Sequence, residues 1–124
     1  MDRTLYLCAA VAGFTGVALG AFAAHALKGS LAPELLNTFE TGVRYQVYHA
    51  FALYAAAWGW ARWQGRLFGT AGWLFAAGIL LFSGSLYLLA VTGTRWLGII
   101  TPFGGLAFLA GWACLGLGAY RAAR

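Results

Sequence analysis

Long apolar runs are the feature of this sequence that most limits how it can fold. Residues 5–27, 69–89 and 97–120 contain no Asp, Glu, Lys or Arg. Because an α-helix rises ~1.5 Å per residue, about 20 such residues cross the ~30 Å hydrocarbon core of a bilayer. Only 9% of the 124 residues are charged, whereas soluble domains carry about 25%. The sequence therefore predicts an integral membrane protein whose backbone polar groups are satisfied within helices.

The apolar runs and the polar breaks between them predict four transmembrane helices in a single membrane domain, residues 1–124. The expected spans cover about residues 5–27, 44–60, 69–89 and 97–120. Pro102 lies near the start of the last run, and proline removes a backbone hydrogen-bond donor. We therefore expect a break or a kink there.

A different pattern connects the first two spans. Leu31, Leu35, Phe39 and Val43 recur every four residues among polar neighbours, and Pro33 stands at a favourable first helical position. This pattern predicts a short amphipathic helix over about residues 31–43 that lies in the interface or re-enters the bundle. Gly42 is the expected turn into the second span. The predicted fold is thus an all-α integral membrane protein with four transmembrane helices plus one short amphipathic or re-entrant helix between the first and second spans.

The basic residues lie at the ends of the apolar runs, singly or in close pairs, although the net charge is +5. They form no stripe of the kind that a phosphate backbone needs, so we expect no nucleic-acid partner. Four spans would put both termini on one side, and the excess of arginine on that side places both termini in the cytoplasm. That side carries Arg3, Arg62, Arg66, Arg121 and Arg124, against Lys28, Arg44 and Arg95 on the other.

Two stripes of small residues run along the first and last spans. Small residues let helix backbones approach closely in lipid, where packing drives association. We expect the stripes to contact helices of this chain, of a second copy or of a partner membrane protein, and the second stripe could pack on the first. The first small-residue stripe comprises Ala9, Gly13, Gly16, Gly20 and Ala24, and the second comprises Gly104, Ala107, Gly111, Cys114 and Gly118. Cys8 and Cys114 have no metal-ligand spacing and are expected to be packing residues.

Most of the polar chemistry lies in residues 39–49, and ionisable groups at a bilayer are candidate functional residues. Glu40 and Arg44 have the favourable i, i+4 order of a helical ion pair. His25 and His49 could bind a metal or relay a proton, but two ligands are too few for a tight metal site, so a packing role is favoured. The candidate ligand-binding cluster, at the outer end of the bundle, comprises His25, Glu40, Arg44, Gln46, Tyr48 and His49, with Ser83 and Thr101 nearby.

No recognisable catalytic constellation accompanies this cluster. Ser83 and Ser85 have no His or Asp beside them, and no G-x-S-x-G motif is present. The glycines match no nucleotide-binding loop. We therefore expect no enzyme activity, no catalytic residue, no bound metal and no cofactor.

Four motifs resemble a known membrane family in their sequence and order. They are GAFAAHAL over residues 20–27, FxTGVRYQxYHA over 39–50, GIxLFSGSLY over 78–87 and ITPFGG over 100–105. The set resembles domain-of-unknown-function family 423, short bacterial inner-membrane proteins similar to the eukaryotic transmembrane protein 256. The resemblance implies a compact four-helix protein of the bacterial inner (plasma) membrane. It implies no established activity and no catalytic residues.

Three functions stay open at this stage. The favoured one is a non-enzymatic membrane module that binds a lipid or a small partner, or stabilises a membrane assembly. The alternative is a small oligomeric transporter or channel with a polar site at the outer end of the bundle. The third is a membrane enzyme that uses the two histidines with a metal. The one-ended distribution of polar residues and the missing catalytic motif support this order.

Overall fold

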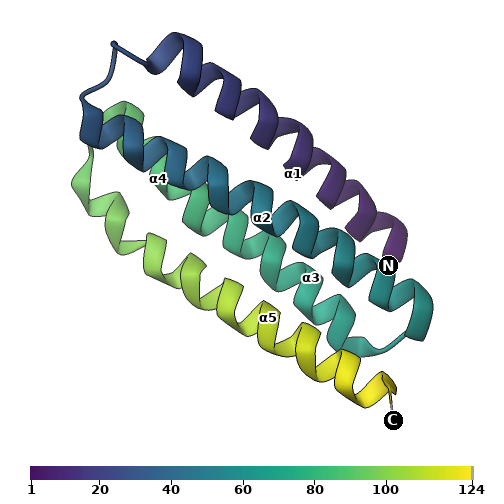
Figure 1. The fold of residues 1–124 in the computed structure, drawn as a ribbon. Helices are drawn as coiled ribbons and strands as arrows, with labels where there is room; N and C mark the ends of the chain where they lie inside the picture. Colours follow the sequence, from purple (N-terminus) through teal and green to yellow (C-terminus); the bar gives the residue numbers. More distant parts are fainter. Residues whose placement is uncertain (124) are drawn as a thin grey trace.

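The computed structural model describes residues 1–123 and the side chains up to residue 122. These residues form four helical rods that lie side by side in alternating directions (Figure 1). Both ends of the described chain lie at the same end of the bundle, which we call the terminal end. The opposite end, where the chain passes from the first rod to the second and from the third to the fourth, is called the turn end. Arg124 lies outside the described residues, so its expected place on the terminal side is not addressed.

Three of the rods combine α-helix with a short segment of a different helical type. The first rod is α1 (Asp2–Phe22) continued by a π-helical turn, η1 (Ala23–Leu27). The third is α3 (Arg66–Gly78), a second π-helical turn, η2 (Ile79–Ser83), and α4 (Gly84–Thr92). The fourth is a 3₁₀ turn, η3 (Arg95–Ile99), followed by α5 (Thr101–Ala123). These three rods are long and apolar enough to cross a membrane.

The second rod, α2 (Pro33–Trp63), is a single helix of 31 residues. The separate amphipathic helix over residues 31–43 and the turn at Gly42 were therefore wrong. Gly42 is buried, and a Cβ there would lie 2.8 Å from Cε1 of Tyr87. This glycine lets α4 approach α2 closely, so it serves packing between helices and does not break the helix.

The helix α2 packs against the other three rods, whereas α1 and α5 lie on opposite sides of the bundle (Figure 1). Its buried face includes Phe39, Gly42, Gln46, His49 and Leu53, which follow one another at spacings of three and four. Two cores result. One is centred on Leu5, Leu53, Phe75 and Phe108, and the other, near the turn end, on Ala23, Leu27, Phe39 and Ala90.

The outside of the bundle is also apolar. Phe14 is 78% exposed and Leu80 is 76% exposed, and many other large apolar side chains of α1 and α5 face outward. A water-soluble bundle would cover this surface with charged residues. The exposed apolar surface therefore agrees with the membrane class predicted from the sequence.

Each small-residue stripe packs within the chain, but the two stripes do not pack on each other. In the first stripe, a Cβ at Gly16 would lie 2.9 Å from Cγ2 of Val47, so this stripe lies against α2. In the second, a Cβ at Gly111 would lie 2.6 Å from Cε1 of Phe75, so α5 packs on α3. The expectation that the second stripe packs on the first was wrong because α2 and α3 lie between them.

The break expected near Pro102 lies just before that residue. The chain changes from the 3₁₀ turn η3 to the α-helix α5 at Thr101. Pro102 therefore falls in the first turn of α5, where its missing N–H leaves no helical hydrogen bond unmade. The proline begins this helix and does not kink it. At the preceding turn, Gly93 ends α4 with φ 71°, a left-handed conformation that favours glycine.

Candidate functional site

His49 lies inside the bundle, between α2 and α5, with both ring nitrogens hydrogen-bonded. Nδ1 is 2.7 Å from the carbonyl oxygen of Tyr45, and Nε2 is 3.1 Å from Nε1 of Trp112. Because an indole nitrogen only donates, Nε2 must accept, and the proton of a neutral ring lies on Nδ1. The ring also stacks on Phe108 at a centroid distance of 3.5 Å. This arrangement holds α5 against α2 and leaves neither nitrogen available for a metal.

Gln46 is the centre of a second set of bonds, which joins three rods. Its Nε2 donates to the carbonyl oxygen of Ala12 at 2.9 Å and to Oγ1 of Thr15 at 2.7 Å. The hydroxyl of Tyr87 donates to its Oε1 at 2.6 Å. Gln46 is only 4% exposed, so these bonds replace contacts with water. We call Thr15, Gln46 and Tyr87 the interhelical amide network.

The two serines of the third rod make separate contacts. Ser83 is fully buried, and its Oγ donates to the carbonyl oxygen of Gly42 at 2.7 Å. Oγ of Ser85 lies 2.6 Å from Oγ1 of Thr101, and this hydrogen bond joins α4 to α5. Neither hydroxyl contacts His49. Both serines therefore hold helices together, and neither has the base that would activate it as a nucleophile.

The structure does not bring the whole candidate cluster together. Glu40 and Arg44 are exposed, and within the described chain they form no ion pair; the Arg44 guanidinium instead donates to Oγ1 of Thr41 at 3.0 Å. The i, i+4 pair expected from their spacing is therefore absent. Tyr48 is exposed, and its ring lies edge-on to the ring of Tyr45.

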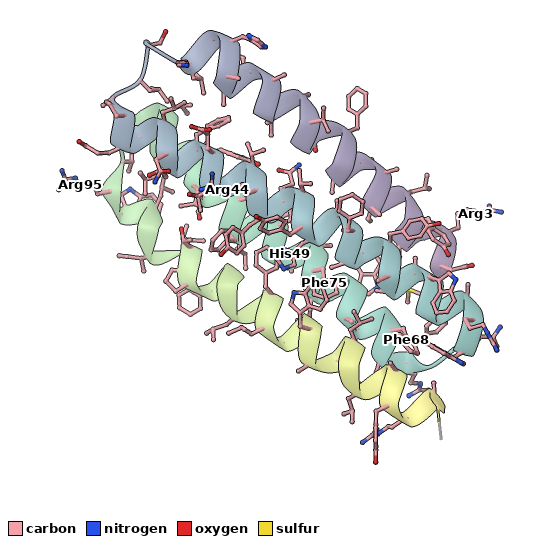
Figure 2. The ribbon with its side chains drawn as sticks, in the orientation of Figure 1. Arg3, Arg44, His49, Phe68, Phe75 and Arg95 are labelled. Carbon is pink, nitrogen blue, oxygen red and sulfur yellow. The ribbon has the colours of Figure 1, made fainter. Side chains whose placement is uncertain are left out.

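The two histidines do not form a pair. His25 is exposed in the π-helical turn η1 and shares no contact with His49, which is buried among aromatic rings. In the part of the chain that the structure describes, no three His, Cys, Asp or Glu side chains gather in a group that could hold a metal ion. The arrangement thus gives no geometric basis for histidine-based metal chemistry. Figure 2 shows His49 inside the bundle, whereas Arg44 and Arg95 lie toward the turn end.

An apolar groove opens on the side of the bundle between the first rod and the third. It has a cavity volume of about 520 Å³, with Gln46 and Leu53 of α2 at its base. One wall is formed by Thr4, Leu7, Val11, Thr15 and Leu19, and the other by Ala76, Ile79, Leu80, Gly84 and Tyr87. Leu7, Val11 and Leu80 are among the exposed apolar residues, so the groove opens outward. We call it the lateral groove.

Neither the roles of Thr15, Tyr87 and Trp112 nor the lateral groove were predicted from the sequence. The three side chains share one sequence signal: each carries a polar atom in the middle of an apolar run, where such an atom needs a partner. The groove has no comparable signal. Its walls come from segments about 70 residues apart in sequence, and only their packing places them face to face.

Comparisons with known proteins agree with the resemblance inferred from the motifs. A family model described as "Protein of unknown function (DUF423)" matches residues 19–105. The chain is 44% identical over 111 residues to the UPF0382 membrane protein YwdK of Bacillus subtilis, a match that covers 89% of this chain and 90% of that protein. It is 40% identical over 123 residues to the UPF0382 inner membrane protein YgdD of Escherichia coli K12, covering 99% and 94%. No solved structure matches the chain.

Proposed function

Because this chain belongs to the DUF423 family of proteins of unknown function, we propose its function from its geometry: a non-enzymatic membrane module that binds the acyl chain of a membrane lipid in the lateral groove. The single observation that carries this proposal is the groove itself. Its volume of about 520 Å³ lies within the range of ~300–1,000 Å³ that is typical of ligand pockets. Its walls are almost entirely hydrocarbon, so the favoured ligand is apolar.

The shape of the lateral groove favours an extended chain over a compact molecule. Along α1 the groove runs from Thr4 to Leu19, a distance of roughly 22 Å at ~1.5 Å per residue. One leaflet of hydrocarbon is about 15 Å thick. The groove is therefore longer than one leaflet is thick, and a lipid tail that lies parallel to the helices could contact it along the whole length of the tail. Apart from Thr4 and Cys8, the polar side chains that line the groove belong to the interhelical amide network, whose members are already hydrogen-bonded to each other.

The proposal includes a bundle of four spans in the bacterial inner membrane. The helix α2 is more polar than the other three rods, but it lies between them along its length (Figure 1). If the other three rods cross the bilayer, α2 must cross it as well, because it packs between them. Arg3, Arg62, Arg66 and Arg121 belong to the terminal end, so we place both termini in the cytoplasm.

The alternative of a small oligomeric transporter or channel remains a prediction. It relied on one polar cluster at the outer end of the bundle, and the structure divides those residues among separate contacts. The prediction of a second copy or a partner subunit also remains untested, and its argument is weaker because the small-residue stripes pack within the chain. No specific observation favours transport over lipid binding.

The decisive test fills the lateral groove with one side chain. Gly84 lines the groove, and a Cβ at this position would have no heavy atom within 4 Å, so Gly84→Leu adds bulk to the groove without a backbone clash. We expect Gly84→Leu to reduce labelling by a phospholipid with a photoreactive group in its acyl chain by roughly tenfold or more, equivalent to ~1.4 kcal/mol. Mass spectrometry of the labelled peptides should place the wild-type adducts on α1 and on the η2–α4 segment.

Gly116→Leu is the matched control. Gly116 is an exposed mid-helix glycine of α5 that also has open space at its Cβ, but it lies outside the groove. This variant should label like the wild type. Equal labelling of the wild type and Gly84→Leu, or adducts spread evenly over all outward faces, would rule out the groove as a lipid site.

A further inference from the structure

A second cavity lies at the terminal end, between the α2–α3 turn and the last turns of α5. Its volume is about 320 Å³. Its lining includes Trp63, Arg66, Phe68, Gly118 and Arg121. It shares no lining residue with the lateral groove, and it differs from the groove in chemistry because two of its side chains carry positive charge. We call it the arginine pocket.

Among the described residues, the two arginines of this pocket have no acidic partner. Within the described chain, neither Arg66 nor Arg121 makes a hydrogen bond or an ion pair. Two like charges that line one small cavity repel each other, and an anion between them removes that cost. A guanidinium group presents a planar fork of donors that matches the oxygens of a phosphate group.

The placement of Arg66 is itself unfavourable unless an anion is present. Arg66 is the first residue of α3, and the first turn of that helix contains no acidic side chain and no side-chain cap. The N-terminus of a helix carries partial positive charge, so an arginine there is destabilised where an aspartate or a glutamate would be stabilised. A bound anion would be attracted both to the guanidinium and to the helix N-terminus, and would offset this repulsion.

Aromatic side chains place the arginine pocket at the depth of lipid headgroups. Trp63 stacks on Phe68 at a centroid distance of 5.5 Å, and the guanidinium carbon of Arg62 lies 5.9 Å from the centre of the Trp63 ring. Tryptophan gathers where a bilayer meets water, at headgroup level. An anion at this depth, beside the ends of three helices, is most readily supplied by the membrane itself.

We propose that Arg66 and Arg121 bind the phosphate group of an anionic phospholipid of the adjacent leaflet in the arginine pocket, with Trp63 and Phe68 as its apolar wall. The site goes beyond the acyl-chain groove, since it selects a lipid by the charge of its headgroup. It depends only on placement of the bundle in a membrane. Failure of the groove proposal would therefore leave this one intact.

The test compares two lipids that differ only in their headgroups. The purified full chain in detergent is titrated with phosphatidylglycerol or phosphatidylcholine of identical acyl chains, and bound lipid is counted by native mass spectrometry. The wild type should prefer phosphatidylglycerol. The double variant Arg66→Gln/Arg121→Gln should lose most of that preference, by roughly tenfold. Because both side chains are exposed and their positive charges repel each other, the variant should unfold at the wild-type temperature or slightly above it, and this measurement confirms that it folds.

Two controls distinguish a site from general attraction of a basic protein to anionic lipid. Arg95→Gln removes an exposed arginine at the turn end and should leave the preference unchanged. Gly84→Leu, which fills the lateral groove, should also leave it unchanged. Equal loss in Arg95→Gln, or full preference in the folded double variant, would overturn the proposal. Displacement of phosphatidylglycerol by low concentrations of inorganic phosphate would make free phosphate the ligand and would overturn the lipid assignment.

Discussion

At the scale of single residues, the buried polar side chains of this bundle form several separate hydrogen-bonded groups and not one site. His49 is bonded to Tyr45 and Trp112, Ser83 to Gly42, and Gln46 to partners on two other rods. No buried side-chain nitrogen or oxygen among the described residues lacks a partner. In lipid no water can satisfy such an atom, so each bond between rods fixes the position of one helix against another. The polar residues therefore explain why the rods pack in one register.

The interhelical amide network gives a residue-scale prediction. Tyr87→Phe removes the hydroxyl that donates to Gln46, and Gln46→Leu removes the acceptor. We expect each variant to be less stable than the wild type and their double-mutant cycle to give a coupling free energy of about 0.6–1.7 kcal/mol, between the average and the maximum found for membrane-embedded hydrogen bonds. Reversible unfolding in mixed micelles measures it. Tyr48→Phe is the control, because the Tyr48 hydroxyl is exposed and bonded to no residue described. A coupling energy near zero would contradict the network.

At the scale of whole elements, glycine decides how closely the rods approach. Gly42 brings α4 to α2, Gly16 brings α1 to α2, and Gly104 brings the start of α5 to η2. The last contact is the tightest, because a Cβ on Gly104 would lie 2.7 Å from Cα of Phe82, an atom of the main chain. A side chain can rotate away from such a clash, but a helix backbone cannot do so without moving the whole rod.

Adjacent glycines of α5 give a matched pair for testing this contact. Gly104→Ala should destabilise the protein by about 1–3 kcal/mol, the usual cost of overpacking. Gly105→Ala should be neutral or slightly stabilising, since its Cβ would lie 4.0 Å from the nearest atom, in the ring of Phe82, and alanine favours helix more than glycine does. Unfolding free energies of both variants in the same micelles give the comparison. Similar values for the two would mean that α5 does not approach η2 as described.

At the scale of the whole molecule, the bundle has two ends with different chemistry and one open side. The terminal end holds the arginine pocket, and the lateral groove opens along one side. Inside the bundle, the buried polar side chains are hydrogen-bonded to one another or to the backbone. Three rods are apolar enough to cross a membrane, and α2 lies among them. The long axis of the bundle, with both termini at one end, therefore defines the expected membrane crossing.

Single cysteines at the two ends test this topology. In a background with Cys8→Ala and Cys114→Ala, Ser30→Cys and Thr92→Cys mark the turn end, and Gln64→Cys marks the terminal end; all three positions are exposed. An impermeant maleimide added to intact spheroplasts should label residues 30 and 92 and should label residue 64 only after permeabilisation. Labelling of residues 30 and 64 from the same side would show that α2 does not cross. Labelling of residue 64 alone would show that the orientation is reversed.

Much of the architecture could be predicted from the sequence because membrane helices are determined locally. The apolar runs near residues 5–27, 69–89 and 97–120 correspond to three of the rods, and the polar break at Gln64 and Gly65 separates α2 from α3. Hydrocarbon leaves the backbone no alternative to helix, so hydropathy along the chain is enough to locate these elements. The four motifs were likewise sufficient to identify the family.

What only the tertiary structure decided concerns pairs of elements far apart in the chain. Gly42 was expected to turn the chain, yet the ring of Tyr87, 45 residues later, gives it a packing role within a continuous helix. His25 and His49 were expected in one polar cluster, yet the fold exposes the first and buries the second. Trp112 became the partner of His49, and two distant helices became the walls of the lateral groove. Hydropathy determines whether a segment enters the membrane, but side-chain shape and hydrogen bonding between segments determine which faces meet. A pattern read along one chain does not carry that information.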